Sequence, residues 1–256
     1  PTRTTPQSSK ISYKRWGNTS RSCLVNFLKA DKFLSSFLRL SLVLVISRAF
    51  LDANFLKENG FTDATALAMY IPNTYEFYWN TSAEEFRDRM LKEYERFWTP
   101  ERKAQAQKQG LTPIEVSILA SIVQKETAKV DERPRIAGVY LNRLHINMKL
   151  QADPTAIFAM KNHTGDYNMV IKRVTEVHTS LQNPYNTYRN YGLPVGLITM
   201  PDISSIEAVL NPEQHDYLFF VADTENYGYH KFSRTYMQHL QGKKQYTRWV
   251  DDKGIK

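Results

Sequence analysis

The stretch ILASIVQKET, residues 118–127, decides how the centre of this sequence is expected to fold. With 3.6 residues per helical turn, side chains four positions apart share one face. One such series is apolar until its last member, which is an acid: Ile114, Ile118, Ile122 and Glu126. Thr112 and Pro113 supply the start signals of a helix, as N-cap and first helical residue. The sequence therefore predicts a helix that ends with a carboxyl group on its apolar face.

The position of Glu126 would raise the pKa of its carboxyl group in two ways. Partial burial disfavours the charged form, and the C-terminal end of a helix dipole disfavours a negative charge. A raised pKa is what a general acid needs near neutral pH. The same carboxylate could instead pair with Arg133 or Arg135 and hold the following loop. Helix geometry leaves both interpretations open.

The composition indicates a folded protein without disulfides. The chain has 256 residues, 42% of them apolar and 12% aromatic, which suffices for a hydrophobic core. Its single cysteine, Cys23, excludes an internal disulfide and argues against a cysteine-based metal site. The net charge of +8 resides in residues 1–50, because residues 51–256 carry equal numbers of basic and acidic side chains. No nucleic-acid partner is therefore expected for the main body.

Residues 1–50 form an atypical basic segment rich in Ser and Arg. Its longest uncharged run, Leu40–Ser47, is far shorter than the roughly 20 residues of a membrane span, so we expect no transmembrane helix. The segment does not begin with Met and has no clear cleavage site. Disorder, an artefact of the sequence, and the remnant of an anchor or of a further domain remain open as interpretations.

From residue 51 onward, helical patterns precede strand patterns. Residues 82–110 read as one long amphipathic helix with a Ser82–Glu85 capping box, and Gly110 closes it. Its expected buried stripe consists of Phe86, Met90, Tyr94 and Phe97. Further helices are expected at 136–146, from 153 onward and at 204–212, and a strand pair at 217–223 and 229–236. This order predicts an α+β fold, with a helical subdomain at 51–110 and a catalytic domain at 111–256 whose short strands lie in its C-terminal part.

Six blocks of this sequence carry a resemblance to a known family. They read LASIVQKET, IAGVYLNRL, MKLQADPTAIFA, NPYNTYRNYGLPVG, ISSIEAVLNP and YLFFVADTENYGYHKFSRTYMQH. In this order they resemble the signature blocks of the endolytic murein transglycosylase family, the YceG-like proteins. The resemblance begins near YIPNTYEFYWNTS, residues 70–82, and runs to near the C-terminus.

The resemblance implies a bacterial cell-wall enzyme on the outer side of the cytoplasmic membrane. Members of the family are anchored in that membrane by an N-terminal helix. It implies cleavage of nascent peptidoglycan glycan strands between N-acetylmuramic acid (MurNAc) and N-acetylglucosamine (GlcNAc), with Glu126 as catalytic acid. Peptidoglycan and peptidoglycan synthases are the implied partners, and no cofactor is expected. The anchor and the LysM-like domain usual in the family are not recognisable in residues 1–50.

A lytic transglycosylase needs only one tuned acid, because the C6 hydroxyl of the muramic acid replaces water. The same carboxyl group first donates a proton and then accepts one, which leaves a 1,6-anhydro sugar end. Other polar and aromatic side chains must then hold the sugar. The candidates for substrate binding are Asn142, Gln151, Asp153, Tyr185, Asn186, Thr187 and Tyr188.

Several of these candidates also have simpler interpretations. Asp153, which precedes Pro154, has the sequence of a helix cap, and near Glu126 it would instead be the second carboxylate of a hydrolase. Asn142 could hold a loop, and the two tyrosines could be core aromatics. His230 and His239 have no third ligand in view, so no metal site is expected.

Three other functions remain open at this stage. The first is a glycan-binding scaffold that has lost catalysis, which the retention of Glu126 opposes. The second is a hydrolytic muramidase, which requires a second carboxylate about 5 to 9.5 Å from the first. The third is binding to nucleic acid or anionic membranes through residues 1–50, which would weaken steeply with salt.

Overall fold

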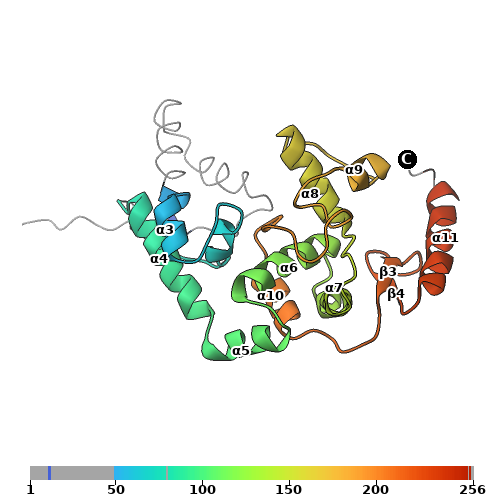
Figure 1. Cartoon of the computed structure of the whole chain (residues 1–256), viewed down its shortest axis with the longest axis horizontal. Helices are drawn as coiled ribbons and strands as arrows, with labels where there is room; N and C mark the ends of the chain where they lie inside the picture. Colours follow the sequence, from blue (N-terminus) through green and yellow to red (C-terminus); the bar gives the residue numbers. More distant parts are fainter. Residues whose placement is uncertain (1–10, 13–48, 79, 253, 255–256) are drawn as a thin grey trace, which may run out of the picture. The chain divides into compact units, whose positions relative to one another are not determined.

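The computed structural model describes residues 11–12, 49–78, 80–252 and 254. The chain divides into two compact units, Pro1–Thr99 and Pro100–Lys256. Figure 1 shows the elements of each. Most of residues 1–50, and with them the expectations stated for that segment, fall outside the part of the chain that the structure describes. Among the residues that are described, no helix combines the length and the apolar composition that a membrane span requires.

The first unit consists of short elements that lead into one longer helix. Its elements are β1 (Ile11–Ser12), α3 (Ala53–Glu58), the 3-10 helix η1 (Ala66–Met69), β2 (Glu76–Phe77) and α4 (Ala83–Phe97). β1 pairs antiparallel with β2. The capping box expected at the start of α4 is confirmed, since the Ser82 hydroxyl accepts from the Glu85 amide and the Glu85 carboxylate accepts from the Ser82 amide.

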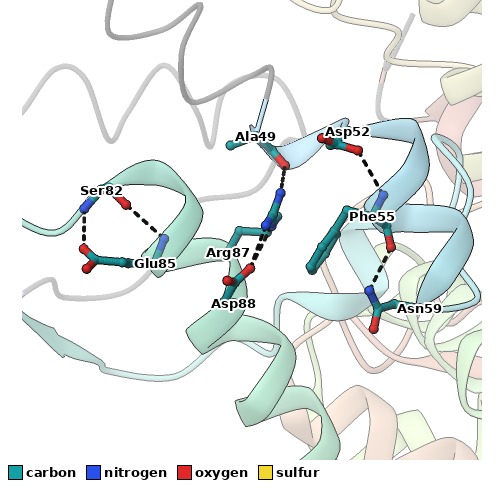
Figure 2. Close-up of polar contacts among 8 residues, drawn as sticks. All are labelled: Ala49, Asp52, Phe55, Asn59, Ser82, Glu85, Arg87 and Asp88. Carbon is teal, nitrogen blue, oxygen red and sulfur yellow. Dashed lines mark hydrogen bonds and ion pairs between the residues drawn. The ribbon is translucent and has the colours of Figure 1, made fainter.

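One arginine joins α3 to α4. The guanidinium of Arg87, on α4, lies 3.7 Å from the centre of the Phe55 ring on α3. It also donates to the Asp88 carboxylate, at 2.8 Å, and to the backbone oxygen of Ala49, at 3.4 Å (Figure 2). The cation therefore holds the segment that precedes α3 against α4 while its charge is neutralised by a neighbouring acid.

The expectation of one helix over residues 82–110 is wrong. α4 ends at Phe97, and a separate helix, α5 (Pro100–Lys108), follows after two residues. Pro100 has no amide hydrogen to continue the ladder and restricts the backbone of Thr99, so the break has a covalent cause. In the expected stripe only Met90 is buried, at 2% exposure, whereas Trp98 at the break is 1% exposed. Gly110 does close α5, with a positive φ of 74°.

The second unit contains the remaining helices and the C-terminal strands. Its helical elements are α5, α6 (Pro113–Glu126), η2 (Val130–Glu132), α7 (Arg133–His145), α8 (Asp153–Thr164), α9 (Glu176–Ser180), α10 (Ile203–Leu210) and α11 (Tyr236–Asp252). β3 (Phe219–Ala222) and β4 (His230–Ser233) pair antiparallel, with Phe220 opposite Phe232. Helices with small antiparallel strand pairs confirm the α+β class.

α6 is the central helix of this unit. It packs against α10, α7, α8 and α5, and Figure 1 shows α6, α7 and α10 grouped together, with α8 above them and the β3–β4 pair to their right. The sequence suggested an apolar stripe, but every residue from Val116 to Val123 is buried. The two serines in this run donate to the oxygens of Pro113 and Ile118, so no hydroxyl is left unpaired. A helix enclosed in this way holds its last residue, Glu126, firmly in place.

Candidate active site

Glu126 is the last residue of α6, as the sequence predicts. The helix begins with the expected cap, because the Thr112 hydroxyl accepts from the Glu115 amide and Pro113 follows. At the other end, the half-buried Glu126 carboxyl accepts a hydrogen bond at Oε1 from the hydroxyl of Tyr140 on α7. The structure thus places the acid between two packed helices.

The pKa of Glu126 is raised from 4.5 to about 7. Burial is the main cause, and the charge of Asp153 acts in the same direction. The hydrogen bond from Tyr140 and the charges of His230 and Arg143 oppose the rise. Near neutral pH the carboxyl is therefore divided between its protonated and its charged form, which suits a group that must both donate and accept a proton.

The alternative in which Glu126 pairs with an arginine of the next helix is wrong. Arg133 donates to the Ser204 hydroxyl at 2.7 Å and lies 3.8 Å from the Asp202 carboxylate. Arg135 pairs with Glu213 at 2.9 Å. Both cations are engaged elsewhere, and the loop after α6 is held by other contacts.

α7 contributes two side chains that the sequence reasoning did not identify. Tyr140 is 1% exposed, and its ring meets Phe220 of β3 edge-on at 5.9 Å. Arg143 is 7% exposed and donates to the backbone oxygens of Leu150 and Leu218, each at 2.6 Å. Burial lowers the pKa of Arg143, which interacts electrostatically with Tyr140 and Glu126. Tyr140 and Arg143 are three residues apart on a predicted helix, so the sequence indicates that they share a face. Nothing in the sequence indicates that this face of α7 meets Glu126.

Asp153 is the first residue of α8 and does not cap it. The N-cap is Ala152, which makes no side-chain hydrogen bond, so the helix-cap interpretation is wrong. The exposed Asp153 carboxylate instead accepts from the Tyr188 hydroxyl at 2.5 Å. Burial, with the Asp153 charge and this hydrogen bond, raises the pKa of the Tyr188 phenol. Both residues interact electrostatically with Glu126, so the structure brings these three candidates into one site.

Thr187 fixes the start of α8. It is 1% exposed, its hydroxyl accepts from the Ala152 amide at 3.0 Å, and it lies 2.7 Å from the Thr155 hydroxyl. Its backbone oxygen accepts from Gln151 at 3.2 Å. The side chain of Gln151 is exposed, and its φ of 46° lies in the left-handed region that disfavours a residue with a Cβ atom. The Thr187 contacts hold this turn and thereby the position of Asp153.

Asn186 and Tyr185 have their contacts away from Glu126. Asn186 is fully buried, and its amide donates to the backbone oxygens of His178, Thr179 and Leu181 while its Oδ1 accepts from the Tyr188 amide. The half-buried ring of Tyr185 packs against Phe158 at 4.7 Å. Asn186 thus shapes the loop that presents Tyr188.

Asn142 ties a distant loop to α7. Its amide donates to the backbone oxygens of His215, at 2.8 Å, and Tyr217, at 3.1 Å. One turn earlier, a Cβ atom at Gly138 would lie 2.6 Å from the oxygen of Glu213, so only glycine permits this approach. These contacts favour the loop-holding alternative for Asn142.

A second buried acid, Glu132, lies in the loop between α6 and α7. It is 4% exposed, and its carboxylate accepts from the His230 backbone amide at 2.7 Å and lies 2.9 Å from His230 Nδ1. Burial opposes its charge, but the hydrogen bonds of His230 and Thr127 outweigh burial and lower the pKa of Glu132. This pair attaches β4 to the site. Within residues 49–78 and 80–252, no group of three or more His, Cys, Asp and Glu side chains could hold a metal.

Comparisons with known proteins identify a family for this chain. The YceG-like family matches residues 17–245. The chain is 33% identical to an endolytic murein transglycosylase of Bacillus subtilis over 176 residues, which are 68% of this chain and 46% of that protein. A protein of the same name from Streptococcus pneumoniae is 35% identical over 152 residues, which are 59% of this chain and 27% of its own length. This chain therefore spans about half or less of the length of these relatives.

A solved structure extends the likeness to the fold. The crystal structure of a yceG-like protein from Listeria monocytogenes matches with a TM-score of 0.69 and 28% identity, over 87% of this chain and 72% of that one. Because the family match covers most of the sequence and includes every residue of the site around Glu126, the chain belongs to the YceG-like family.

Proposed function

We propose that this chain carries the catalytic site of a lytic transglycosylase that cleaves the MurNAc–GlcNAc bond of peptidoglycan and leaves 1,6-anhydro-MurNAc ends. The observation that carries the proposal is the carboxyl of Glu126, held at the end of a buried helix with a pKa of about 7. The names of the similar proteins support peptidoglycan as substrate.

The proposed reaction has two proton transfers through the same carboxyl group. Protonated Glu126 donates to the glycosidic oxygen, so the bond to C1 breaks and the leaving sugar departs as an alcohol. The sugar that remains has oxocarbenium character at C1. Its own C6 hydroxyl then attacks C1 and returns a proton to Glu126, which closes the 1,6-anhydro ring and restores the acid.

Tyr188 and Asp153 are the proposed sugar-binding groups nearest to this chemistry. Tyr188 offers a ring face with its hydroxyl engaged by Asp153, and the exposed Asp153 has a further carboxylate oxygen for a sugar hydroxyl. The negative charge of Asp153 also favours a cationic sugar in the transition state. The exposed Gln151, two residues before Asp153, completes the proposed binding set. Tyr185 lies three residues before Tyr188 in the loop that presents it.

We place this activity on the outer side of the cytoplasmic membrane, where peptidoglycan strands grow, with peptidoglycan synthases as the partners whose products it would shorten. The support for both statements is membership of the family and the cell-wall substrate in the names of its relatives.

A peptidoglycan digest analysed by mass spectrometry tests the proposal. We expect 1,6-anhydro-MurNAc products from this chain and a loss of about 10³-fold or more with Glu126→Gln, since one group performs both proton transfers. Glu213→Gln, which makes the same substitution at an exposed glutamate paired with Arg135, is the matched control and should leave product formation unchanged.

The other outcomes separate the alternatives. Reducing ends that contain an added water would indicate a hydrolase and make Asp153 the second carboxylate. Absence of product from every protein, together with cosedimentation on insoluble peptidoglycan, would favour a glycan-binding scaffold.

A further inference from the structure

Tyr140 contacts the proposed acid without having a part in the two proton transfers described above. Its side chain is 1% exposed and is enclosed between α6, α7 and the β3–β4 pair, with Phe220 edge-on to its ring. Its hydroxyl donates to Oε1 of Glu126. Within residues 49–78 and 80–252 no other group forms a hydrogen bond with the Glu126 carboxyl.

The direction of this hydrogen bond follows from the acidities of the two groups. Burial, followed by the charge of Glu126 and the hydrogen bond itself, raises the pKa of Tyr140 well above its ordinary value. The phenol therefore keeps its proton throughout the pH range in which Glu126 titrates, so it always donates and Oε1 always accepts. The carbonyl oxygen of a protonated carboxyl group is its better acceptor, so the hydrogen bond at Oε1 favours the proton on the other oxygen, Oε2.

We propose that Tyr140 is a positioning residue for Glu126: it holds Oε1 as a permanent acceptor and so reserves Oε2 for the proton that is exchanged with the sugar. This inference rests on the proposed function. The same oxygen then serves both proton transfers, because Oε2 first loses its proton to the glycosidic oxygen and then takes the proton of the C6 hydroxyl. Without Tyr140 the carboxyl could rotate and offer either oxygen.

The other groups that face Glu126 come from α7 itself, α8 and β4 and do not duplicate this role. Arg143 on α7 is held by two backbone oxygens, Asp153 on α8 accepts from Tyr188, and His230 on β4 is paired with Glu132. They act on Glu126 through their charges. Tyr140 alone among these described groups contacts an oxygen of the acid and can select between its two oxygens.

Tyr140→Phe tests the inference, because it removes the hydroxyl and keeps the ring. With soluble glycan strands we expect kcat to fall about ten-fold while KM changes less than two-fold, which corresponds to about 1.4 kcal/mol in the transition state. The phenol stabilises the charged carboxylate, so its loss should also move the alkaline limb of the pH profile upward by about half to one unit.

A second measurement does not depend on activity. In protein labelled with 13C at the glutamate carboxyl carbon, the resonance that titrates near neutral pH and disappears in Glu126→Gln belongs to Glu126. In Tyr140→Phe its midpoint should rise. A variant that had lost its fold would instead titrate near the ordinary value of 4.5, so misfolding has its own signature.

Tyr229→Phe is the matched control. It also removes a phenol that donates to a carboxylate, here Asp131 at 3.0 Å, on an exposed part of the same unit. It should leave kcat, the pH profile and the Glu126 titration unchanged. Unchanged kcat and an unmoved titration in Tyr140→Phe would overturn the inference, whereas full activity of Glu126→Gln would overturn the proposed function itself.

Discussion

Two acids on either side of one loop, Glu126 and Glu132, are both withdrawn from solvent but hold their protons differently. Glu126 receives one hydrogen bond, from the Tyr140 phenol, and its pKa rises to about 7 because burial is the largest influence. Glu132 is only 4% exposed, yet its pKa falls. The two acids differ in their donors, since Glu132 is bonded by a backbone amide, an imidazole and the Thr127 hydroxyl.

The comparison shows that burial alone does not decide whether a carboxyl keeps its proton. A buried carboxylate remains charged where enough donors replace the water it has lost, and it takes up a proton where they do not. One acid then holds β4 in place, and the other is available for proton transfer. The two acids should therefore affect stability with opposite dependence on pH.

Removing the paired acid should have the largest effect. Glu132→Ala leaves the His230 amide and ring without their acceptor in a buried place, so we expect a loss of about 3–4 kcal/mol in the free energy of unfolding. A lowered pKa contributes stability above the unfolded value and loses it as pH falls, so this effect should shrink below pH 4.5. Urea unfolding at pH 8 and pH 4 measures both quantities.

The control for that experiment is Glu213→Ala, which breaks an exposed pair with Arg135 and should cost less than about 1 kcal/mol. Equal losses for the two variants would show that the contacts of Glu132 do not stabilise the fold more than a surface ion pair does.

Removing the proposed acid should have a smaller effect of opposite sign. The folded state keeps the proton of Glu126 up to about pH 7 and the unfolded state up to about 4.5, so stability falls as pH rises between these values. Glu126→Gln removes this penalty. We expect it to stabilise the protein by roughly 2–3 kcal/mol at pH 8 and by little at pH 4, allowing for partial solvent access.

Thermal or urea unfolding of Glu126→Gln across this pH range would make the comparison quantitative. A stability difference from the parent chain that stays constant from pH 4 to pH 8 would mean that Glu126 has the same pKa in the folded and unfolded states. The contrast with Glu132 would then have no basis.

The smallest expected effect comes from a donor to the paired acid. Thr127 is 3% exposed and its hydroxyl supports Glu132. Thr127→Val keeps the shape and removes this donor, so it should cost about 1 kcal/mol in urea unfolding and leave the titration of Glu126 unmoved. Thr179→Val, which removes an exposed hydroxyl that donates to the Glu176 backbone, should cost less. A shifted Glu126 titration in Thr127→Val would show that the two acids are coupled.

Local chemistry made much of the fold predictable. Thr112 with Pro113 and Ser82 with Glu85 are local start signals that act within one turn of chain, and both helices begin where these residues predict. The strand pair follows from β-prone residues on both sides of a polar turn. The break before Pro100 is equally local, but the apolar repeat on either side of it predicts a continuous helix that the proline interrupts.

By itself, the sequence determined the helix that ends in Glu126, the α+β order of elements and the resemblance to a family. Only the tertiary structure decided what surrounds that acid. Tyr140, Asp153, Tyr188 and His230 lie in different elements, and the pKa of Glu126 depends on distances among them that no periodicity encodes. Hydrogen bonds and desolvation act over a few ångströms in space, whereas helix signals act over a few residues of chain. For this reason the sequence predicts where the carboxyl lies on its helix, but only the tertiary structure determines its pKa.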